Sequence, residues 1–395
     1  MIDRTLCRIG AVSGLLAAVT FGLFGTGLAQ AAAPIIPPPP DIAATSYLLI
    51  DASSSEVLVE HNAHEQNPPA SLTKIMTSYL AEQEISEGRI APSDEVLVSV
   101  NAWRTGGSKM FIREGTRVTV GELLRGIIIQ SGNDSSVALA EHIGGSETAF
   151  ANMMNQQAVV LGMNNSHFKN ATGLPDSEHY SSAWDLALLT RDLIARFPEH
   201  YALYSERSYE YNDIEQPNRN KLLWRDRTVD GVKTGFTNSA GYCLVASAVR
   251  QGMRLISVVM GTDSDRARMR ESQKLLSYGF RYYETQSLYE ADVALKEQEL
   301  FYGAEDAVGL GVTEDVVLTF PRGYYKDIEA ELVVPKIVEA PLDQGQKVGE
   351  IKLRLNGDII YEAPLVALQQ VEEAGMFSRM ADFISLFFSQ LLSGD

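Results

Sequence analysis

The sequence predicts a mixed α/β (α+β) fold in which helices cover an antiparallel sheet, followed by a small all-β domain and a C-terminal amphipathic helix. Strand-like runs stand near residue 50 and again between residues 228 and 261, with helical periodicity between them. Short alternating runs separated by turn residues fill residues 291–367. Apolar side chains then recur at helical spacing up to residue 392.

The N-terminal segment, residues 1–31, is predicted to be a signal peptide. Arg4 and Arg8 form a positive start, residues 9–28 are mostly apolar, and Ala29-Gln30-Ala31 is a small-x-small cleavage pattern. An uncleaved membrane anchor is the alternative, since about 20 apolar residues can span a bilayer. The glycines of the apolar stretch and the proline-rich run at residues 34–40 favour cleavage. The protein is therefore expected to be exported.

The composition excludes several classes of function. A formal net charge of −18 argues against a nucleic acid partner. Cys7 would leave with the signal peptide, and the single remaining Cys243 excludes an intramolecular disulfide. His61 and His64 stand in a polar, turn-like stretch, so no metal site is predicted, and without a nucleotide-binding motif no cofactor is expected. A mature chain of about 360 residues favours two domains.

The first domain, residues 41–287, shows its strand and helix signals in a clear order. A strand pair is predicted at residues 46–50 and 56–59, and a helix follows Pro68-Pro69. The remaining elements are predicted, in chain order, as helices at residues 120–129 and from residue 134, strands at 228–233, 242–249 and 255–260, and a helix at 267–283.

The second domain, residues 291–367, is predicted to be a β-sandwich and contains no candidate catalytic set. The helix predicted at residues 369–392 carries Met, Phe and Leu side chains on one broad face. Such a face suits insertion into a membrane surface, and packing on the protein's own core or on a dimer partner is the alternative. Its regular polar face argues against a membrane span. Arg379 is its only cation, so attraction to anionic lipid would be weak.

Ser71-Leu72-Thr73-Lys74 is a candidate pair of nucleophile and base. Residues three apart share a helix face, so the Lys74 amine can reach the Ser71 hydroxyl, which needs a base at neutral pH. Pro68-Pro69 places Ser71 in the first helical turn, where free N–H groups stabilise negative charge. The pKa of Lys74 must fall for this role, through burial and through the like charge of Lys233. For this motif alone, a capping serine followed by a solvated lysine is the alternative.

Ser131-Gly132-Asn133 lies between two predicted helices, and loops held by rigid elements often carry function. The Ser131 hydroxyl can relay a proton to a leaving amine, and the Asn133 amide can bind a substrate carbonyl. An ordinary helix-ending turn with a cap for the next helix is the alternative, and one segment can serve both purposes.

Lys233-Thr234-Gly235 ends a predicted strand and is the only Lys-Thr-Gly in the chain. Its lysine and threonine can hold a substrate carboxylate, and Gly235 lets another backbone approach closely. The strand edge can also pair with an extended peptide. A plain turn is the alternative.

Each motif is weak alone, because a second Ser-x-x-Lys occurs at Ser166–Lys169 and a second Ser-x-Asn at Ser99–Asn101. In this order the three motifs match the active-serine set of penicillin-binding proteins and serine β-lactamases. The sequence around them resembles, more narrowly, the low-molecular-weight D-alanyl-D-alanine carboxypeptidases of peptidase family S11. The resemblance covers roughly residues 44–285 and rests on Met110-Phe111 and on residues 124–134, 170–175, 218–224, 229–235 and 240–248.

This resemblance implies a β-lactamase/transpeptidase-like catalytic domain over residues 41–287. Ser71 would attack the carbonyl of the penultimate D-alanine in a peptidoglycan stem pentapeptide, and Lys74 would be the base for acylation and for hydrolysis. Ser131 would relay the proton, and the N–H groups of Ser71 and Phe236 would form the oxyanion hole. The implied substrate-binding residues are Asn133, Lys233, Thr234, Gly235, Phe236 and Arg268.

Three further positions follow from the same resemblance. Arg268 is the better placed partner for the terminal carboxylate, with Arg266 as the alternative in the same arginine-rich segment. Asp185 is expected behind the site. Some relatives carry a histidine after Lys-Thr-Gly, where this chain has Phe236, which removes a titratable group and bears on the hydrolysis of the acyl-enzyme.

The resemblance also implies partners and a location. β-Lactam antibiotics would acylate Ser71, and the protein would act in peptidoglycan maturation and cell-shape control. It would be periplasmic and attached peripherally to the outer face of the cytoplasmic membrane. The alternatives are a serine β-lactamase, a transpeptidase in which an amine replaces water, and a non-catalytic wall-binding scaffold.

Overall fold

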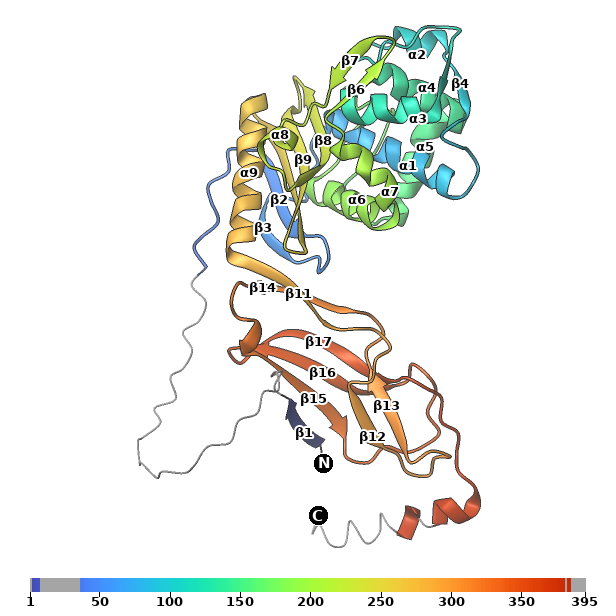
Figure 1. The fold of residues 1–395 in the computed structure, drawn as a ribbon, viewed down its shortest axis with the longest axis vertical. Coiled ribbons are helices and arrows are strands. Elements are labelled where there is room, and N and C mark those ends of the chain that lie inside the picture. The colour runs from blue at the N-terminus through green and yellow to red at the C-terminus, as the bar shows by residue number, and fades with distance from the viewer. Residues whose placement is uncertain (1, 8–35, 381, 385–395) are drawn as a thin grey trace. The chain divides into compact units, whose positions relative to one another are not determined.

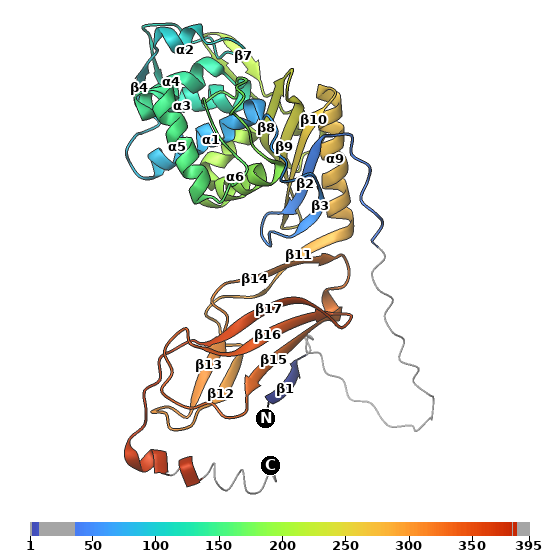
Figure 2. The same ribbon diagram turned by 180° about the vertical axis from the view of Figure 1, so that it is seen from behind.

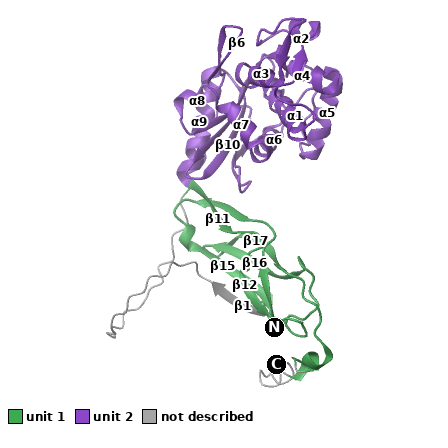
Figure 3. Ribbon diagram, turned by 45° about the vertical axis from the view of Figure 1, so that its right-hand side comes forward, with its two compact units in different colours: residues 1–36, 283–395 green, residues 37–282 purple. Residues whose placement is uncertain are grey.

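The computed structural model describes residues 2–7, 36–380 and 382–384. Its contacts divide the chain into two units, one of residues 37–282 and one of residues 1–36 with 283–395 (Figure 3). The predicted signal peptide lies outside the described residues except for Ile2–Cys7, which forms strand β1. No helix among the described residues is long and apolar enough to cross a membrane.

The larger unit is built on a five-stranded antiparallel sheet with the strand order β3-β2-β10-β9-β8 (Figure 1). Because β8 stands at the end of this order, one of its edges has no neighbouring strand within the described part of the chain. The strands are β2 (Ser46–Asp51), β3 (Val57–His61), β8 (Val229–Thr237), β9 (Gly241–Arg250) and β10 (Met253–Thr262).

Alternate residues of β10 face two different helical layers. Ile256, Val258 and Met260 belong to the core shared with the helices on one face. On the other face runs α9 (Asp265–Tyr282), where Gly279 lies directly against Leu255. Figure 2 shows α9 along one side of the sheet and the remaining large helices on the other. The predicted antiparallel sheet flanked by helices is therefore confirmed.

The helical layer also holds two short two-stranded sheets, β4 (Glu95–Leu97) with β5 (Arg117–Thr119) and the hairpin β6 (Ser208–Tyr211) with β7 (Ile214–Pro217). Its helices are α1 (Lys74–Ser86), α2 (Val100–Arg104), α3 (Val120–Arg125), α4 (Asn133–Gly144), α5 (Glu147–Val160), α6 (Ala183–Arg196), α7 (Pro198–Tyr201) and α8 (Leu222–Arg225), with a 3₁₀ turn, η3, at Ala202–Ser205.

Two predicted helices change their winding next to the motifs. The segment predicted as one helix over 120–129 is α-helical only to Arg125 and continues as a π-helical turn, η2 (Gly126–Gln130). Ser71 lies in a 3₁₀ turn, η1 (Ala70–Thr73), that leads into α1. Extra or tighter turns of this kind re-aim the residues that follow them, and they often occur at functional sites.

The smaller unit holds a six-stranded sheet, β1-β15-β16-β17-β13-β12, and a two-stranded sheet, β11-β14. Apolar residues of both sheets form one core, which fits the predicted sandwich. Besides β1, its elements are β11 (Tyr283–Tyr289), β12 (Lys296–Glu299), β13 (Ala307–Gly311), β14 (Val316–Pro321), η4 (Tyr325–Asp327), β15 (Ile328–Pro335), β16 (Lys347–Leu355) and β17 (Asp358–Ala367). The unit starts at residue 283 and not at 291, because β11 pairs with β14.

The C-terminal helix begins at Met376, so the predicted start at residue 369 was wrong. Val371 and Glu373 instead form isolated β-bridges with Leu342 and Gly303, and these keep the preceding segment extended. The apolar side chains of the described helical residues are largely solvent-exposed: Met376, Phe377, Met380, Phe383 and Ile384. The predicted residues 385–392 lie outside the described part of the chain.

Candidate active site

The nucleophile and base candidates are in direct contact. Lys74 Nζ lies 3.1 Å from Ser71 Oγ, 2.7 Å from Asn133 Oδ1 and 2.6 Å from the Thr172 carbonyl oxygen. Lys74 is only 1% exposed, while the Ser71 residue is partly accessible. The structure therefore brings the first two motifs together and leaves the serine open to a ligand.

These three oxygens orient the amine. When Lys74 is neutral, it keeps two N–H donors and one lone pair. The Asn133 and Thr172 oxygens accept hydrogen bonds only, so they hold the two donors. The lone pair is then left for the Ser71 hydroxyl, which is the arrangement that a general base requires.

Burial lowers the pKa of Lys74 to about 7, and the carboxylates of Asp134 and Glu147 oppose this shift. The sequence interpretation also invoked the charge of Lys233, which is not among the resolved causes for Lys74. The pKa of Lys233 itself falls well below its usual value, first through burial and then through the charge of Lys74. Desolvation is thus the main reason that Lys74 can be neutral at physiological pH.

Asn133 is fixed from both ends of its amide. Its Oδ1 accepts from Lys74, and its Nδ2 donates to the Gly106 carbonyl at 2.6 Å. The loop that carries Gly106 is anchored by Asp134, whose carboxylate accepts backbone N–H groups of residues 110, 111 and 112 at 2.8 to 3.3 Å. Asp134 therefore both shapes the loop and places a buried negative charge near Lys74.

Ser131 and Lys233 form a second serine–lysine pair in the site. Ser131 follows the π-helical turn and has a left-handed backbone with φ of +64°, an uncommon conformation for a serine. Lys233 Nζ donates to Ser131 Oγ at 2.8 Å and to the Thr234 carbonyl at 3.2 Å. The lysine of the third motif is thus hydrogen-bonded to the serine of the second motif.

The third motif passes close to the nucleophile's turn because Gly235 has no side chain. A Cβ at Gly235 would lie 2.9 Å from the Pro69 carbonyl oxygen. The Gly235 carbonyl in turn accepts from Arg268 at 2.8 Å. The sequence predicted that the strand ends at this motif. In the structure, β8 instead continues to Thr237.

Arg268 and Phe236 line a hollow of about 490 Å³ beside β8. Arg268 is buried and ion-paired with Asp265, and its guanidinium stands over the Tyr242 ring. The Phe236 ring, 48% exposed, packs on the same Tyr242 with ring centroids 4.2 Å apart. Arg266, by contrast, is exposed and does not line this hollow, so the geometry favours Arg268 as a carboxylate partner.

A loop over residues 164–182 supplies contacts to the site that none of the three motifs predicted. It provides the Thr172 carbonyl for Lys74, and Asn170 Oδ1 holds its turn by accepting the N–H groups of Thr172 and Gly173. His179 bonds Thr73 Oγ1 through Nε2 at 2.8 Å. A carbonyl has no sequence signature, so only the Asn-Ala-Thr-Gly turn signal could have pointed to this loop.

The duplicate motifs do not form sites. Ser166 Oγ bonds Ser181 and Asp185, whereas Lys169 Nζ pairs with Glu178, so this serine and lysine do not meet. Ser99 caps α2. The Asp185 carboxylate also accepts the Asn165 N–H, so it holds the start of the 164–182 loop and bonds none of the candidate site residues. Among the described residues, no group of His, Cys, Asp or Glu could hold a metal ion.

Comparison with known proteins assigns both units. Residues 33–264 match the model of the family Peptidase_S11, described as D-alanyl-D-alanine carboxypeptidase. Residues 283–373 match the model PBP5_C, described as penicillin-binding protein 5, C-terminal domain.

Individual relatives agree with these family matches. The chain is 44% identical over 354 residues to the D-alanyl-D-alanine carboxypeptidase DacC of Escherichia coli (strain K12), covering 87% of this chain and 88% of the relative. Penicillin binding protein 5 from Haemophilus influenzae is structurally similar with a TM-score of 0.82 and 42% identity, covering 85% of this chain and 99% of that one. Penicillin-Binding Protein D2 from Listeria monocytogenes, in an ampicillin-bound form, matches with a TM-score of 0.57 and 29% identity, covering 62% and 100%.

The substitution Gly173→Ala tests how closely the 164–182 loop packs against the turn that carries Ser71. It has φ of +79°, and a Cβ there would overlap the Ala70 carbonyl. Gly88 has φ of +72° and open space around it, so Gly88→Ala isolates the backbone strain, about 1 kcal/mol. We expect Gly173→Ala to cost about 3 kcal/mol, because steric overlap adds to the strain. Urea unfolding followed by tryptophan fluorescence measures the difference, since all three tryptophans lie in this unit. Equal costs would contradict the close contact.

The pKa of Lys74 predicts the pH dependence of acylation. With Lys74 as the candidate base, the free amine is the active form, so acylation by a fluorescent penicillin should rise with pH to a plateau, with a midpoint of about 7. Asp134→Asn removes a charge that raises this pKa, so its midpoint should move to lower pH. Asp185→Asn, also buried, is the control and should keep the wild-type midpoint. A midpoint that stays in place in Asp134→Asn would exclude the electrostatic coupling.

Proposed function

The chain belongs to the peptidase S11 family of D-alanyl-D-alanine carboxypeptidases, and we propose that Ser71 is its nucleophile and Lys74 its general base. The observation that carries this assignment is the contact of a buried amine, with a pKa of about 7, with the Ser71 hydroxyl. The reaction is the removal of the terminal D-alanine from peptidoglycan stem pentapeptides.

Acylation begins when Ser71 Oγ attacks the carbonyl carbon of the penultimate D-alanine and its proton passes to neutral Lys74. The backbone N–H groups of Ser71 and Phe236 stabilise the oxyanion. Asn133 holds the carbonyl of the preceding peptide bond. The terminal carboxylate lies against Thr234 and Arg268, beside the 490 Å³ hollow.

The leaving amine receives its proton through Ser131. Lys233 donates a hydrogen bond to Ser131 Oγ, which orients the Ser131 hydroxyl toward the amine nitrogen. As the C–N bond breaks, Ser131 gives its hydroxyl proton to the nitrogen and receives the proton that Lys74 took from Ser71, so Lys74 is neutral again. Water then attacks the acyl-enzyme carbonyl and gives a proton to Lys74, which is neutral again. Lys74 passes this proton to Ser71 Oγ as the ester bond breaks, so the shortened peptide leaves and Ser71 is restored. A β-lactam acylates the same serine, but its opened ring does not depart as the D-alanine does, so it clears slowly.

The proposed reaction takes place on the peptidoglycan of the bacterial cell wall. The action on stem peptides fits peptidoglycan maturation and the control of cell shape in the periplasm. The exposed apolar side chains of the helix from Met376 support peripheral attachment to the outer face of the cytoplasmic membrane. Arg379 pairs with Glu373, so this attachment depends on apolar insertion more than on charge.

The nucleophile assignment predicts one acylated residue. After exposure to penicillin, mass spectrometry should find the adduct on the peptide containing Ser71, and a D-Ala-D-Ala pentapeptide should yield free D-alanine. Ser71→Ala should lose both, because the proposed nucleophile is removed and the Ser131 hydroxyl is already bonded by Lys233. Ser166→Ala, from the duplicate motif, should keep both. A rapid penicillin turnover would instead indicate a β-lactamase, and cross-linked peptide a transpeptidase.

The membrane proposal predicts vesicle binding that is insensitive to lipid charge. The purified protein should float with vesicles of phosphatidylethanolamine and phosphatidylglycerol, and doubling the anionic fraction should change binding little. Phe377→Ser with Met380→Ser should lose binding, while Arg379→Gln should keep most of it. Strong dependence of binding on anionic lipid would contradict apolar insertion.

A further inference from the structure

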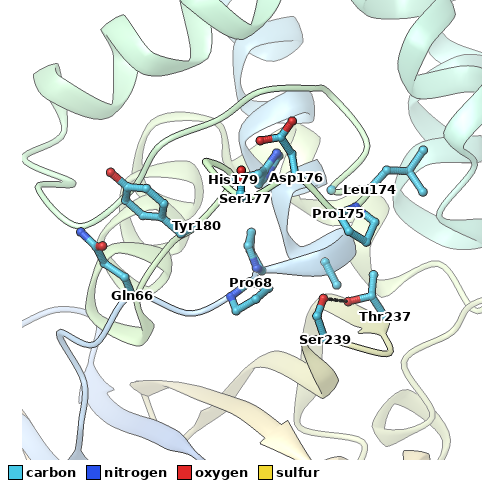
Figure 4. A pocket seen from close by; sticks show the side chains of 13 residues that line it. Gln66, Pro68, Leu174, Pro175, Asp176, Ser177, His179, Tyr180, Thr237 and Ser239 are labelled. Carbon is cyan, nitrogen blue, oxygen red and sulfur yellow. Dashed lines mark hydrogen bonds between the residues drawn. The ribbon is translucent and has the colours of Figure 1, made fainter.

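The Thr172 carbonyl that accepts from Lys74 belongs to the 164–182 loop, and this loop is open on its outer side. Leu174, Pro175 and Asp176 line a hollow of about 530 Å³ there (Figure 4). A hollow gives the loop no support from that side. The position of the Thr172 carbonyl must therefore be fixed by contacts on the inner side of the loop.

The inner contacts hold the backbone of Ala171 from two helices. Its N–H donates to Glu147 Oε1 at 3.1 Å, and its carbonyl accepts from Thr77 Oγ1 at 2.7 Å. The carbonyl of the next residue, Thr172, accepts from Lys74 at 2.6 Å. Ala171 is thus held between α1 and the start of α5, directly before the residue whose carbonyl orients the amine.

Glu147 ties the turn of this segment to another part of the fold. Asn170 accepts the N–H groups of Thr172 and Gly173, but it belongs to the same turn, so it shapes the turn without placing it. Glu147 accepts from outside the loop, and the Ala171 residue that it holds is fully buried.

The start of α5 is itself firmly placed. Glu147 lies in its first turn, where an acidic side chain is favoured by the helix dipole. Ser146 caps the helix by accepting the Ala149 N–H at 3.1 Å. Gly144 at the end of α4 packs so closely that a Cβ there would lie 2.7 Å from the Phe150 nitrogen. The partly buried Glu147 carboxylate is therefore a fixed acceptor.

The Glu147 carboxylate also acts on Lys74 through its charge. It raises the pKa of Lys74, and the Asp134 charge does so more strongly. Burial raises the pKa of Glu147 itself, the bond from Ala171 lowers it, and the charges of Glu141 and Lys74 have smaller and opposite effects.

Two further titratable groups face the Lys74 amine. Lys233 lies on β8, and its pKa is lowered first by burial and then by the charge of Lys74. His179 lies in the 164–182 loop, and burial lowers its pKa to about 4, so its ring is neutral at physiological pH. Neither group supplies a negative charge that replaces that of Glu147.

We propose that Glu147 is a positioning residue of the active site, which holds the Ala171 N–H and thereby the Thr172 carbonyl that orients the Lys74 amine. The inference rests on the proposed function, in which Lys74 is the base. Glu147 has two separable effects. Its oxygen fixes the loop and so promotes proton transfer, whereas its negative charge favours the protonated amine.

Glu147→Gln and Glu147→Ala separate these effects. Glutamine keeps an oxygen for the Ala171 N–H but has no charge, and alanine has neither. Acylation by a fluorescent penicillin is followed across pH, and rates are taken from the acylated fraction, so unfolded protein does not contribute. Glu147→Ala should lower the plateau rate about five- to tenfold, which corresponds to one lost hydrogen bond. Glu147→Gln should keep the plateau within about twofold.

Both variants should move the midpoint of the pH profile to lower pH, because each lacks a charge that raises the pKa of Lys74. The shift should be smaller than that of Asp134→Asn, since the Asp134 charge has the larger effect. Glu141→Gln is the charge control, because Glu141 is not among the charges that shift the pKa of Lys74. Its amide oxygen can keep the bond from Asn101, so plateau and midpoint should stay as in the wild type.

Ser146→Ala is the control for a merely structural effect. It removes the cap of α5 but not the bond to Ala171, so it should unfold at lower urea concentration and keep both plateau and midpoint. An unchanged plateau in Glu147→Ala, an equal loss in Glu147→Gln or in Ser146→Ala, or an unmoved midpoint would overturn the proposal. A wild-type protein that is not acylated at Ser71, or whose acylation does not change with pH, would instead refute the proposed function.

Discussion

The burial of the Lys74 amine is the constraint on which the site depends. A buried amine is stable only when its hydrogens are bonded to oxygen acceptors. Moving an unpaired donor from water into the protein interior costs roughly several kcal/mol. The amine's three partners come from three places in the chain: Asn133 at the start of α4 and Thr172 in the 164–182 loop accept its hydrogens, and Ser71 in η1 faces its lone pair. None of these segments can shift without leaving the amine unpaired. The position of Ser71, the proposed nucleophile, is therefore set partly by the hydrogen bonds that the buried Lys74 amine requires.

Close backbone contacts also hold the turn that carries Ser71 in place. Gly235 on β8 and Gly173 in the loop both lie against residues 69 and 70, where a Cβ would meet a carbonyl oxygen. The turn carrying Ser71 is thus confined between a strand and a loop that are far apart in sequence. Such confinement lowers the freedom of the serine before substrate binds, which is how a rigid site reduces the entropic cost of reaction.

Periodicity and turn signals were sufficient to predict the sheet covered by helices, because Ile256, Val258 and Met260 alternate in sequence as they do across β10. The three motifs likewise identified side chains that the structure brings together. The π-helical turn at residues 126–130 could not be predicted, since its residues also suit an α-helix. Nor could the Thr172 carbonyl, because backbone groups carry no sequence pattern. The C-terminal helix was predicted too early, because the bridges at Val371 and Glu373 are tertiary contacts.

Phe236 stands where some relatives carry a histidine, and this limits which side chains of the site can transfer protons. Phe236 cannot exchange a proton, and its ring instead packs on Tyr242, over which the Arg268 guanidinium stands. Phe236 therefore contributes shape and helps to order Arg268, the proposed carboxylate partner, through the Tyr242 ring that both contact. In the proposed mechanism, proton transfer is left to Lys74 and to the Ser131–Lys233 pair. Because acylation and hydrolysis share Lys74 as base in the proposed mechanism, a change in the burial of this amine is expected to alter the rates of both steps.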